Sequence, residues 1–143
     1  MTEKTPDFEI VNHTADLGML VRGKDLQDLF VSAATALAGL LARRNSNKPP
    51  TQVPISLEGE DLTDTFVRWL GEILYLFNGE GLLFTGVSKF TLSPPRYVEA
   101  IVLAAPYDPE KDEIVHEIKA VTYHQASVSQ VSDGWEARVI FDL

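Results

Sequence analysis

The last residues of this chain, Trp135–Leu143, alternate between apolar and polar side chains. A period of two is the pattern of a β-strand that buries one of its faces. The pattern predicts a closing strand with an apolar core face and an outer face that ends in a carboxylate. The core face consists of Trp135, Ala137, Val139 and Phe141, and the outer face of Glu136, Arg138, Ile140 and Asp142. The strand therefore brings the Asp142 carboxylate and the last residue, Leu143, to one point outside the core.

Two amphipathic helices are predicted upstream of this strand. In the first, Asp25 is an N-cap and the apolar side chains from Leu26 to Leu41 recur at helical spacing. The second runs over Asp61–Asn78, and Gly79 is placed to terminate it. Between the helices, Val53–Leu57 has the length of a strand, and its Pro54 predicts a position at an edge or an end.

The remaining segments are rich in strand residues. Phe8–His13 and Met19–Arg22 predict two strands, with Thr14–Gly18, and therefore Asp16, as the bend between them. The others are a hairpin of Leu82–Leu92 and Tyr97–Ala104 around the turn Ser93–Arg96, an irregular strand over Val115–Ser132, and a two-residue turn at Asp133-Gly134. The order predicts an α+β fold in which two helices pack on one side of a mostly antiparallel or mixed β-sheet.

Composition limits the classes of function. A length of 143 residues predicts a single domain over residues 1–143, and 45% hydrophobic with 23% charged residues is typical of a globular chain. No apolar run reaches about 20 residues and no signal peptide is evident, so we expect a cytoplasmic protein without a membrane partner. The absence of cysteine excludes thiolate metal sites. A net charge of -9 opposes direct nucleic-acid binding, so any such role should run through a partner.

Several familiar sites are absent. The acidic segment Tyr107–Glu113 lacks the glycine and glutamate that a calcium-binding helix-loop-helix needs, and it is interpreted as a solvated loop, as is the linker-like stretch Arg43–Pro50. The three histidines match no zinc signature. Neither a Gly-x-Ser-x-Gly nucleophile motif nor a phosphate-binding glycine loop occurs.

Asp16, Lys119 and Asp142 remain as candidates because each lies at an element end or outside the core face. Aspartate is common in turns for structural reasons, and Lys119 is equally consistent with an outward strand lysine. If Asp16 lies beside Asp142 and Leu143, however, their oxygens form a site for a hard divalent cation. The residues themselves leave open whether these groups meet.

Four stretches together resemble the archease family: His13–Gly18, the helix containing Leu29-Phe30, Ile118–His124 and Val139–Leu143. The resemblance spans the whole chain. It implies a small acidic α+β protein that is not itself an enzyme but activates the RtcB-type tRNA-splicing RNA ligase. Such proteins promote guanylylation of the ligase histidine and multiple turnover, and they contact tRNA only through the ligase.

The same resemblance implies a cofactor and a set of site residues. The family binds a divalent cation, assigned as calcium, with Mg²⁺ or Mn²⁺ as alternatives. Carried over to this sequence, the metal ligands are Asp16, Asp142 and the carboxylate or carbonyl of Leu143, and Lys119 is the functional lysine. Two other hypotheses stay open: a metal-dependent phosphohydrolase acting on nucleotides or RNA ends, and a generic chaperone or protein-interaction module.

Overall fold

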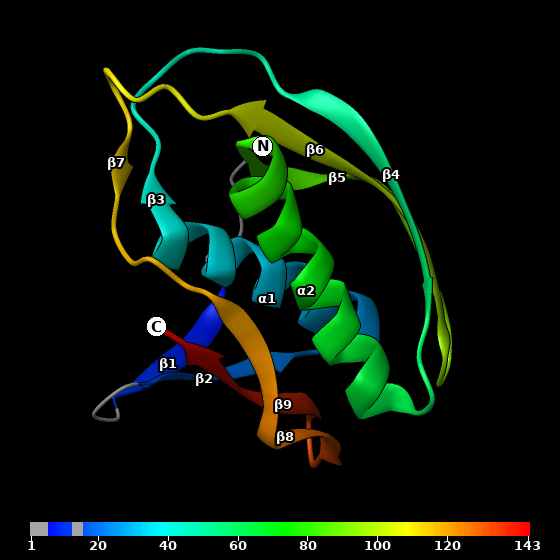
Figure 1. Ribbon diagram of the computed structural model, residues 1–143. Coiled ribbons are helices and arrows are strands. Elements are labelled where there is room, and N and C mark those ends of the chain that lie inside the picture. Colours follow the sequence, from blue (N-terminus) through cyan, green and yellow to red (C-terminus); the bar gives the residue numbers. More distant parts are fainter. Residues whose placement is uncertain (1–5, 13–15) are drawn as a thin grey trace.

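The computed structural model describes residues 6–12 and 16–143 (Figure 1). Its elements are β1 (Asp7–Asn12), β2 (Asp16–Gly23), α1 (Leu26–Leu41), β3 (Ala42–Arg43), β4 (Thr51–Glu58), α2 (Leu62–Glu80), β5 (Leu82–Ser93), β6 (Tyr97–Pro106), β7 (Glu113–Ile114), β8 (Ala120–Val131) and β9 (Gly134–Asp142). The two helices and the strands confirm the α+β class. None of the helices in the described part of the chain is long and apolar enough to span a membrane.

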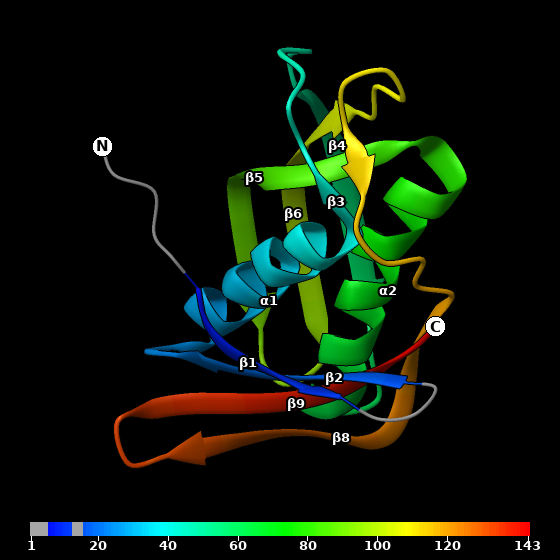
Figure 2. The ribbon, with the colours of Figure 1, turned by 90° about the vertical axis from the view of Figure 1, so that its left-hand side faces the viewer.

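The described strands form three sheets, and every pairing is antiparallel. The orders are β1-β2-β9-β8, β4-β6-β5 and the short pair β3-β7. Both helices lie between the two larger sheets: α1 contacts β2 and β5, and α2 contacts β8 and β5 (Figure 2). Each large sheet therefore buries one face against the helices. Of the two positions predicted from Pro54, an edge or an end, the strand takes the edge, because among the described strands β4 pairs only with β6.

The first helix begins at its predicted N-cap, Asp25, and Asp61, the predicted first residue of the second helix, is the N-cap of α2. The carboxylate of Asp25 accepts the backbone N–H of Asp28, and that of Asp61 accepts the backbone N–H of Asp64, each at 2.8 Å. The prediction that Gly79 ends α2 is wrong. The helix ends at Glu80 and is capped by Gly81, whose φ of 67° places it in the left-handed region that glycine adopts without a steric penalty.

An aromatic cluster fills the space between the helices and the three-stranded sheet. Trp69 is fully buried, and its indole N–H donates to the carbonyl of Phe30 at 2.8 Å. The ring of Phe30 packs edge-on against Phe66, while Phe84 and Phe90 pack edge-on against Trp69. The bonded indole at the centre of this cluster fixes α2 against α1 without leaving its polar atom unpaired.

The acidic segment Tyr107–Glu113 is not wholly solvated, because Asp112 is buried. Its carboxylate accepts the backbone N–H groups of Asn45, Ser46 and Asp108 and the Ser46 hydroxyl, at 2.6 to 2.9 Å. Burial alone would raise the pKa of Asp112, but these hydrogen bonds outweigh it and lower the pKa to about 2. The ionised carboxylate joins this segment to the loop that follows α1, so the prediction of two solvated loops is wrong at this point.

The predicted irregular strand over Val115–Ser132 is shorter in the structure, where β8 begins at Ala120. Its predicted bulge is confirmed by a register shift between Thr122 and Ser127. The following turn lies one residue earlier than predicted, since Val131 pairs with Gly134. Gly134 is needed for close packing: a Cβ there would collide with the carbonyl of Gly23 at the end of β2.

Candidate metal centre

Asp16 and Asp142 occupy directly opposite positions in β2 and β9. Opposite residues of an antiparallel pair point to the same face of the sheet, with Cβ atoms about 5 Å apart. The neighbouring pair, Leu17 and Phe141, is buried in the core, so both aspartates lie on the outer face. The convergence that the sequence leaves open is thus present at the backbone level.

Asp16 itself lies on a strand, so its predicted placement in the bend is wrong. It is the first residue of β2. The beginning of the predicted bend, Thr14, and the motif residue His13 lie outside the described residues. Strand pairing places the Asp16 carboxylate more firmly than a turn would, because its register is set by the buried residues that follow.

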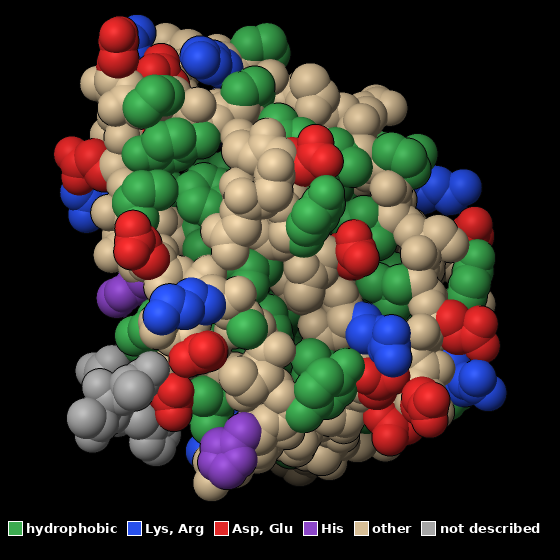
Figure 3. Space-filling model, viewed as in Figure 1, with side chains coloured by type: hydrophobic (Ala, Val, Ile, Leu, Met, Phe, Trp, Pro, Cys, Tyr) green, Lys and Arg blue, Asp and Glu red, His purple; other side chains and the backbone are tan. Residues whose placement is uncertain are grey.

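Lys119 and Leu143 complete the group. The backbone N–H of Lys119 donates to the carbonyl of Asp142 at 2.7 Å, just before Ala120 pairs with Asp142 at the start of β8. Leu143 follows Asp142 and is 37% exposed. Figures 1 and 2 both show the C-terminal end beside the starts of β2 and β8, and in Figure 3 acidic and basic side chains gather there.

The two aspartates carry uncompensated charge. Within residues 6–12 and 16–143, neither carboxylate forms an ion pair or a hydrogen bond. Like charges at directly opposite strand positions repel, so the pair destabilises the fold unless a cation lies between them. The arrangement therefore has the electrostatics of a cation site.

The donors expected at this position are all oxygen atoms. The described residues contain no group of three or more His, Cys, Asp or Glu side chains that could hold a metal ion. The donors expected from the sequence, the carboxylates of Asp16 and Asp142 and the oxygens of Leu143, include only two such side chains. Oxygen donors suit hard cations such as Ca²⁺, Mg²⁺ or Mn²⁺ and disfavour softer metals that prefer nitrogen or sulfur. The residues present therefore fit a hard cation rather than a softer metal.

A groove of about 380 Å³ borders Lys119, between the end of α2 and the segment that precedes β8. Among its lining residues, the side-chain amide of Asn78 donates to the carbonyl of Ile118 at 2.9 Å. The following residue, Lys119, is bonded to Asp142. The end of α2 therefore positions the stretch that carries the lysine, although this stretch has no strand partner of its own.

Residues 8–143 match the model of the Archease protein family. The chain belongs to the archease family. The archease of Methanosarcina acetivorans is 32% identical over the full length of both chains, and that of Methanopyrus kandleri is 33% identical, covering 95% of this chain and 99% of its own.

Solved structures agree with this membership. The solution structure of protein 1598 of Methanobacterium thermoautotrophicum has a TM-score of 0.77 at 28% identity and covers 95% of this chain and 98% of its own. The crystal structure of a Thermotoga maritima archease, described as a possible chaperone, has a TM-score of 0.62 at 19% identity, with 93% and 94% covered. The latter likeness concerns the fold alone.

A hydrogen-bonded cluster around Asp64 includes Tyr123, near the end of the Ile118–His124 motif, and was not predicted from the sequence. The Tyr123 hydroxyl donates to the Asp64 carboxylate at 2.6 Å, and the same carboxylate accepts from Arg68 at 2.9 Å and from the backbone N–H of Glu60 at 2.8 Å. The bond from Tyr123 is the largest cause that lowers the pKa of Asp64 to about 2. The partners are 59 residues apart, so only long-range packing brings them together.

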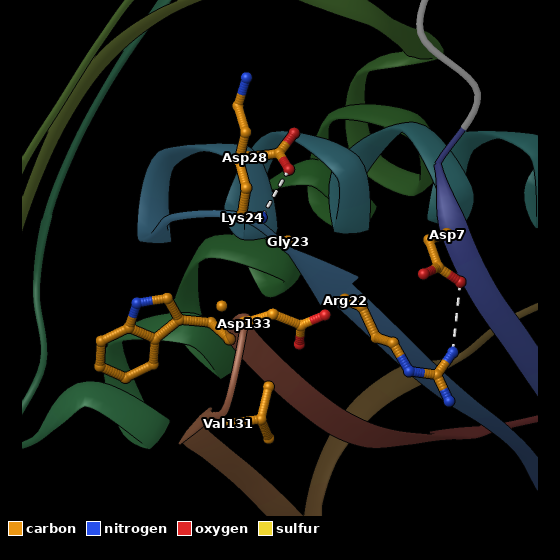
Figure 4. Close-up of a pocket in the computed structure, with 9 residues that line it drawn as sticks. Asp7, Arg22, Gly23, Lys24, Asp28, Val131 and Asp133 are labelled. Atoms are coloured by element: carbon orange, nitrogen blue, oxygen red, sulfur yellow. Dashed lines mark hydrogen bonds and ion pairs between the residues drawn. The ribbon is translucent and has the colours of Figure 1, made fainter.

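A charged pocket of about 300 Å³ lies at the opposite end of β2 (Figure 4). It is lined by residues around Gly23 and the β8–β9 turn, including Lys24, Asp133 and Trp135. In Figure 4 the Arg22 guanidinium reaches Asp7, at 3.2 Å. Arg22 also pairs with two glutamates, Glu9 at 2.6 Å and Glu136 at 3.3 Å, so its charge is compensated within the sheet. None of the four predicted site residues lines this pocket.

Proposed function

We propose that this protein is an accessory factor that activates an RtcB-type tRNA-splicing RNA ligase and performs no catalysis of its own. Family membership supports this function, and the observation that carries it is the register of Asp16 opposite Asp142. The chain contributes charge and position, while the nucleophile, a histidine, belongs to the ligase.

In this proposal, the carboxylates of Asp16 and Asp142 and an oxygen of Leu143 hold one divalent cation at the outer end of the sheet. A bound cation of this type neutralises phosphate oxygens and lowers the cost of negative charge that develops during phosphoryl transfer. The strand register keeps the two carboxylates side by side before any ion binds, so little ordering is needed.

Lys119 supplies the complementary charge. It is exposed, and its backbone N–H is bonded to the carbonyl of Asp142, so its side chain starts beside the C-terminal end of β9. The ammonium group is then available to a triphosphate bound by the ligase, where it stabilises developing negative charge. Asp16 and Asp142 thus bind the cation, and Lys119 contacts the anion.

The overall charge of -9 suits a basic partner that itself binds RNA. Complementary charge speeds encounter, so we expect association with the ligase to weaken as ionic strength rises. Because contact with tRNA is assigned to the ligase, the acidic surface of this protein does not conflict with a role in tRNA processing.

The direct test compares wild type with Asp142→Asn in an assay of ligase guanylylation with the purified ligase of the same organism. Asparagine nearly preserves the shape and removes the charge, and Asp133→Asn is a matched exposed control at the far end of the sheet. We expect Asp142→Asn to lose the stimulation and Asp133→Asn to keep it. Full stimulation by Asp142→Asn, with the fold confirmed by circular dichroism, would refute the proposal. Phosphate release without the ligase would instead favour the phosphohydrolase hypothesis.

A further inference from the structure

β8 is an edge strand without charged side chains. It pairs only with β9, and no other described segment runs along its second side in Figure 2. Its 12 residues, Ala120–Val131, include no Asp, Glu, Lys or Arg, although 23% of the chain is charged. Most of its residues are exposed. Such an edge presents unpaired backbone groups that can accept another strand.

The other edges of the two larger sheets carry the usual defences against such pairing. β1 has Asp7 and Glu9, and β4 has Pro54 and Glu58. β5 has Lys89 and two register irregularities. Charges, proline and bulges all discourage strand addition. Among the edges that the structure describes in these sheets, β8 alone lacks both charge and proline.

The register of the β8–β9 hairpin identifies the free backbone groups. Val131 pairs with Gly134 across a two-residue turn, and the pair that flanks such a turn exchanges hydrogen bonds. Because bonded and non-bonded pairs alternate along an antiparallel ladder, Val128 and Gln130 direct their N–H and C=O groups away from β9. The bulge between Thr122 and Ser127 interrupts the ladder, so the regular free edge is Ser127–Val131.

We propose that a second copy of this chain adds antiparallel to this edge, with a two-fold axis at Ser129. In that register Val128 of each copy lies opposite Gln130 of the other, so the outward groups of both copies form four backbone hydrogen bonds. Ser129 faces its own equivalent, and no like charges are opposed along the edge. The two four-stranded sheets become one continuous sheet of eight strands.

The occupant is a second copy because the edge is complementary to itself, whereas it offers no charge with which to select a different partner. The interface is small, so the dimer is transient and depends on concentration. Two bodies of charge -9 repel each other, so salt should strengthen this association, the opposite of the salt effect expected for ligase binding. The paired edge lies near Gly134 and the candidate metal centre lies at Asp142, so both metal centres stay open.

Sedimentation equilibrium over a wide range of concentration tests the dimer through substitutions at Ser129. Ser129→Lys and Ser129→Glu each oppose like charges at the two-fold axis, so we expect each to raise the dissociation constant about fivefold or more. An equimolar mixture of the two variants should restore association, which a second copy in this register requires. Gln130→Pro removes one outward N–H per copy and should weaken the dimer about tenfold.

Thr91→Lys is the matched control, because Thr91 is exposed and lies opposite Glu99 just as Ser129 lies opposite Glu136. It should associate as wild type does, and thermal unfolding confirms that each variant is folded. A wild-type protein that stays monomeric up to about millimolar concentration, a Ser129→Lys variant that associates like wild type, or a mixture that stays monomeric overturns the proposal. None of these outcomes affects the ligase assay, which tests a different end of the sheet.

Discussion

Removing the charge of Asp142 should stabilise the cation-free protein. Asp16 and Asp142 lie directly opposite each other on the outer face, with Cβ atoms about 5 Å apart. Two unit charges at that distance repel by about 0.8 kcal/mol in bulk water and about 3 kcal/mol at an effective dielectric constant near 20. Asp142 is exposed and Asp16 half-buried, so we expect Asp142→Asn to gain about 1 kcal/mol.

For a chain of 143 residues, that gain corresponds to a rise in Tm of about 3 °C. The assay is thermal unfolding in a chelating buffer at low salt, with Asp16→Asn, Asp142→Asn, the double variant and Asp133→Asn as the control. Either single substitution relieves the same repulsion, so the double variant should gain little more than one of them. The gain should also vanish near 1 M salt, where screening acts within about 3 Å.

A lower Tm for Asp142→Asn in chelator would contradict this account, as would gains that simply add in the double variant. An equal rise in Tm for the Asp133→Asn control would show that the gain in stability reflects the total charge of the protein rather than the opposed pair of aspartates. We expect the Asp142 carboxylate to lower the stability of the cation-free protein. Such a cost is typical of a functional residue rather than a structural one.

Three further predictions concern the scaffold. Tyr123→Phe should cost about 1 kcal/mol at neutral pH, measured by urea unfolding, because it deletes the bond to Asp64. Because the pKa of Asp64 is lowered to about 2, its contribution is complete above its unfolded value of 3.8 and is lost as pH falls through about 2. Tyr123→Phe should raise the pKa of Asp64 and so narrow the pH range over which this contribution is lost. An unchanged dependence of the unfolding free energy on acid pH would contradict this. Asp112→Asn should lower Tm and speed amide exchange at Ser46, and unaltered exchange would count against the buried network. Gly81→Ala should cost about 1 kcal/mol in the same urea assay because of its φ of 67°, and a neutral result would contradict the left-handed cap.

Local signals in the sequence predicted local structure well. Asp25 and Asp61 mark helix starts because a capping carboxylate acts within its own turn of chain. Alternation in the last strand predicted which side of the sheet carries Asp142, since the buried residues Val139 and Phe141 fix the face. The glycine that ends α2 was misplaced because the sequence offers Gly79 and Gly81 two residues apart, and of these only Gly81 has the left-handed φ of 67°.

Contacts between distant segments could not be predicted in the same way. Asp112 occurs in a run of charges typical of a solvated loop, and its donors at Asn45 and Ser46 lie 67 and 66 residues away. The position of Asp16 opposite Asp142 likewise depends on the pairing of β2 with β9, which no local pattern specifies. Family resemblance named these two aspartates together, and the sheet register supplies the physical reason that they can act together.

Calorimetric titration of the chelator-treated protein with Ca²⁺ and with Mg²⁺ measures directly whether the opposed aspartates bind a cation. We expect one cation per chain for wild type and for Asp133→Asn, and loss of most of that affinity in both Asp16→Asn and Asp142→Asn. Binding of wild-type strength in either of the last two variants would contradict a metal centre built on the opposed aspartates of β2 and β9.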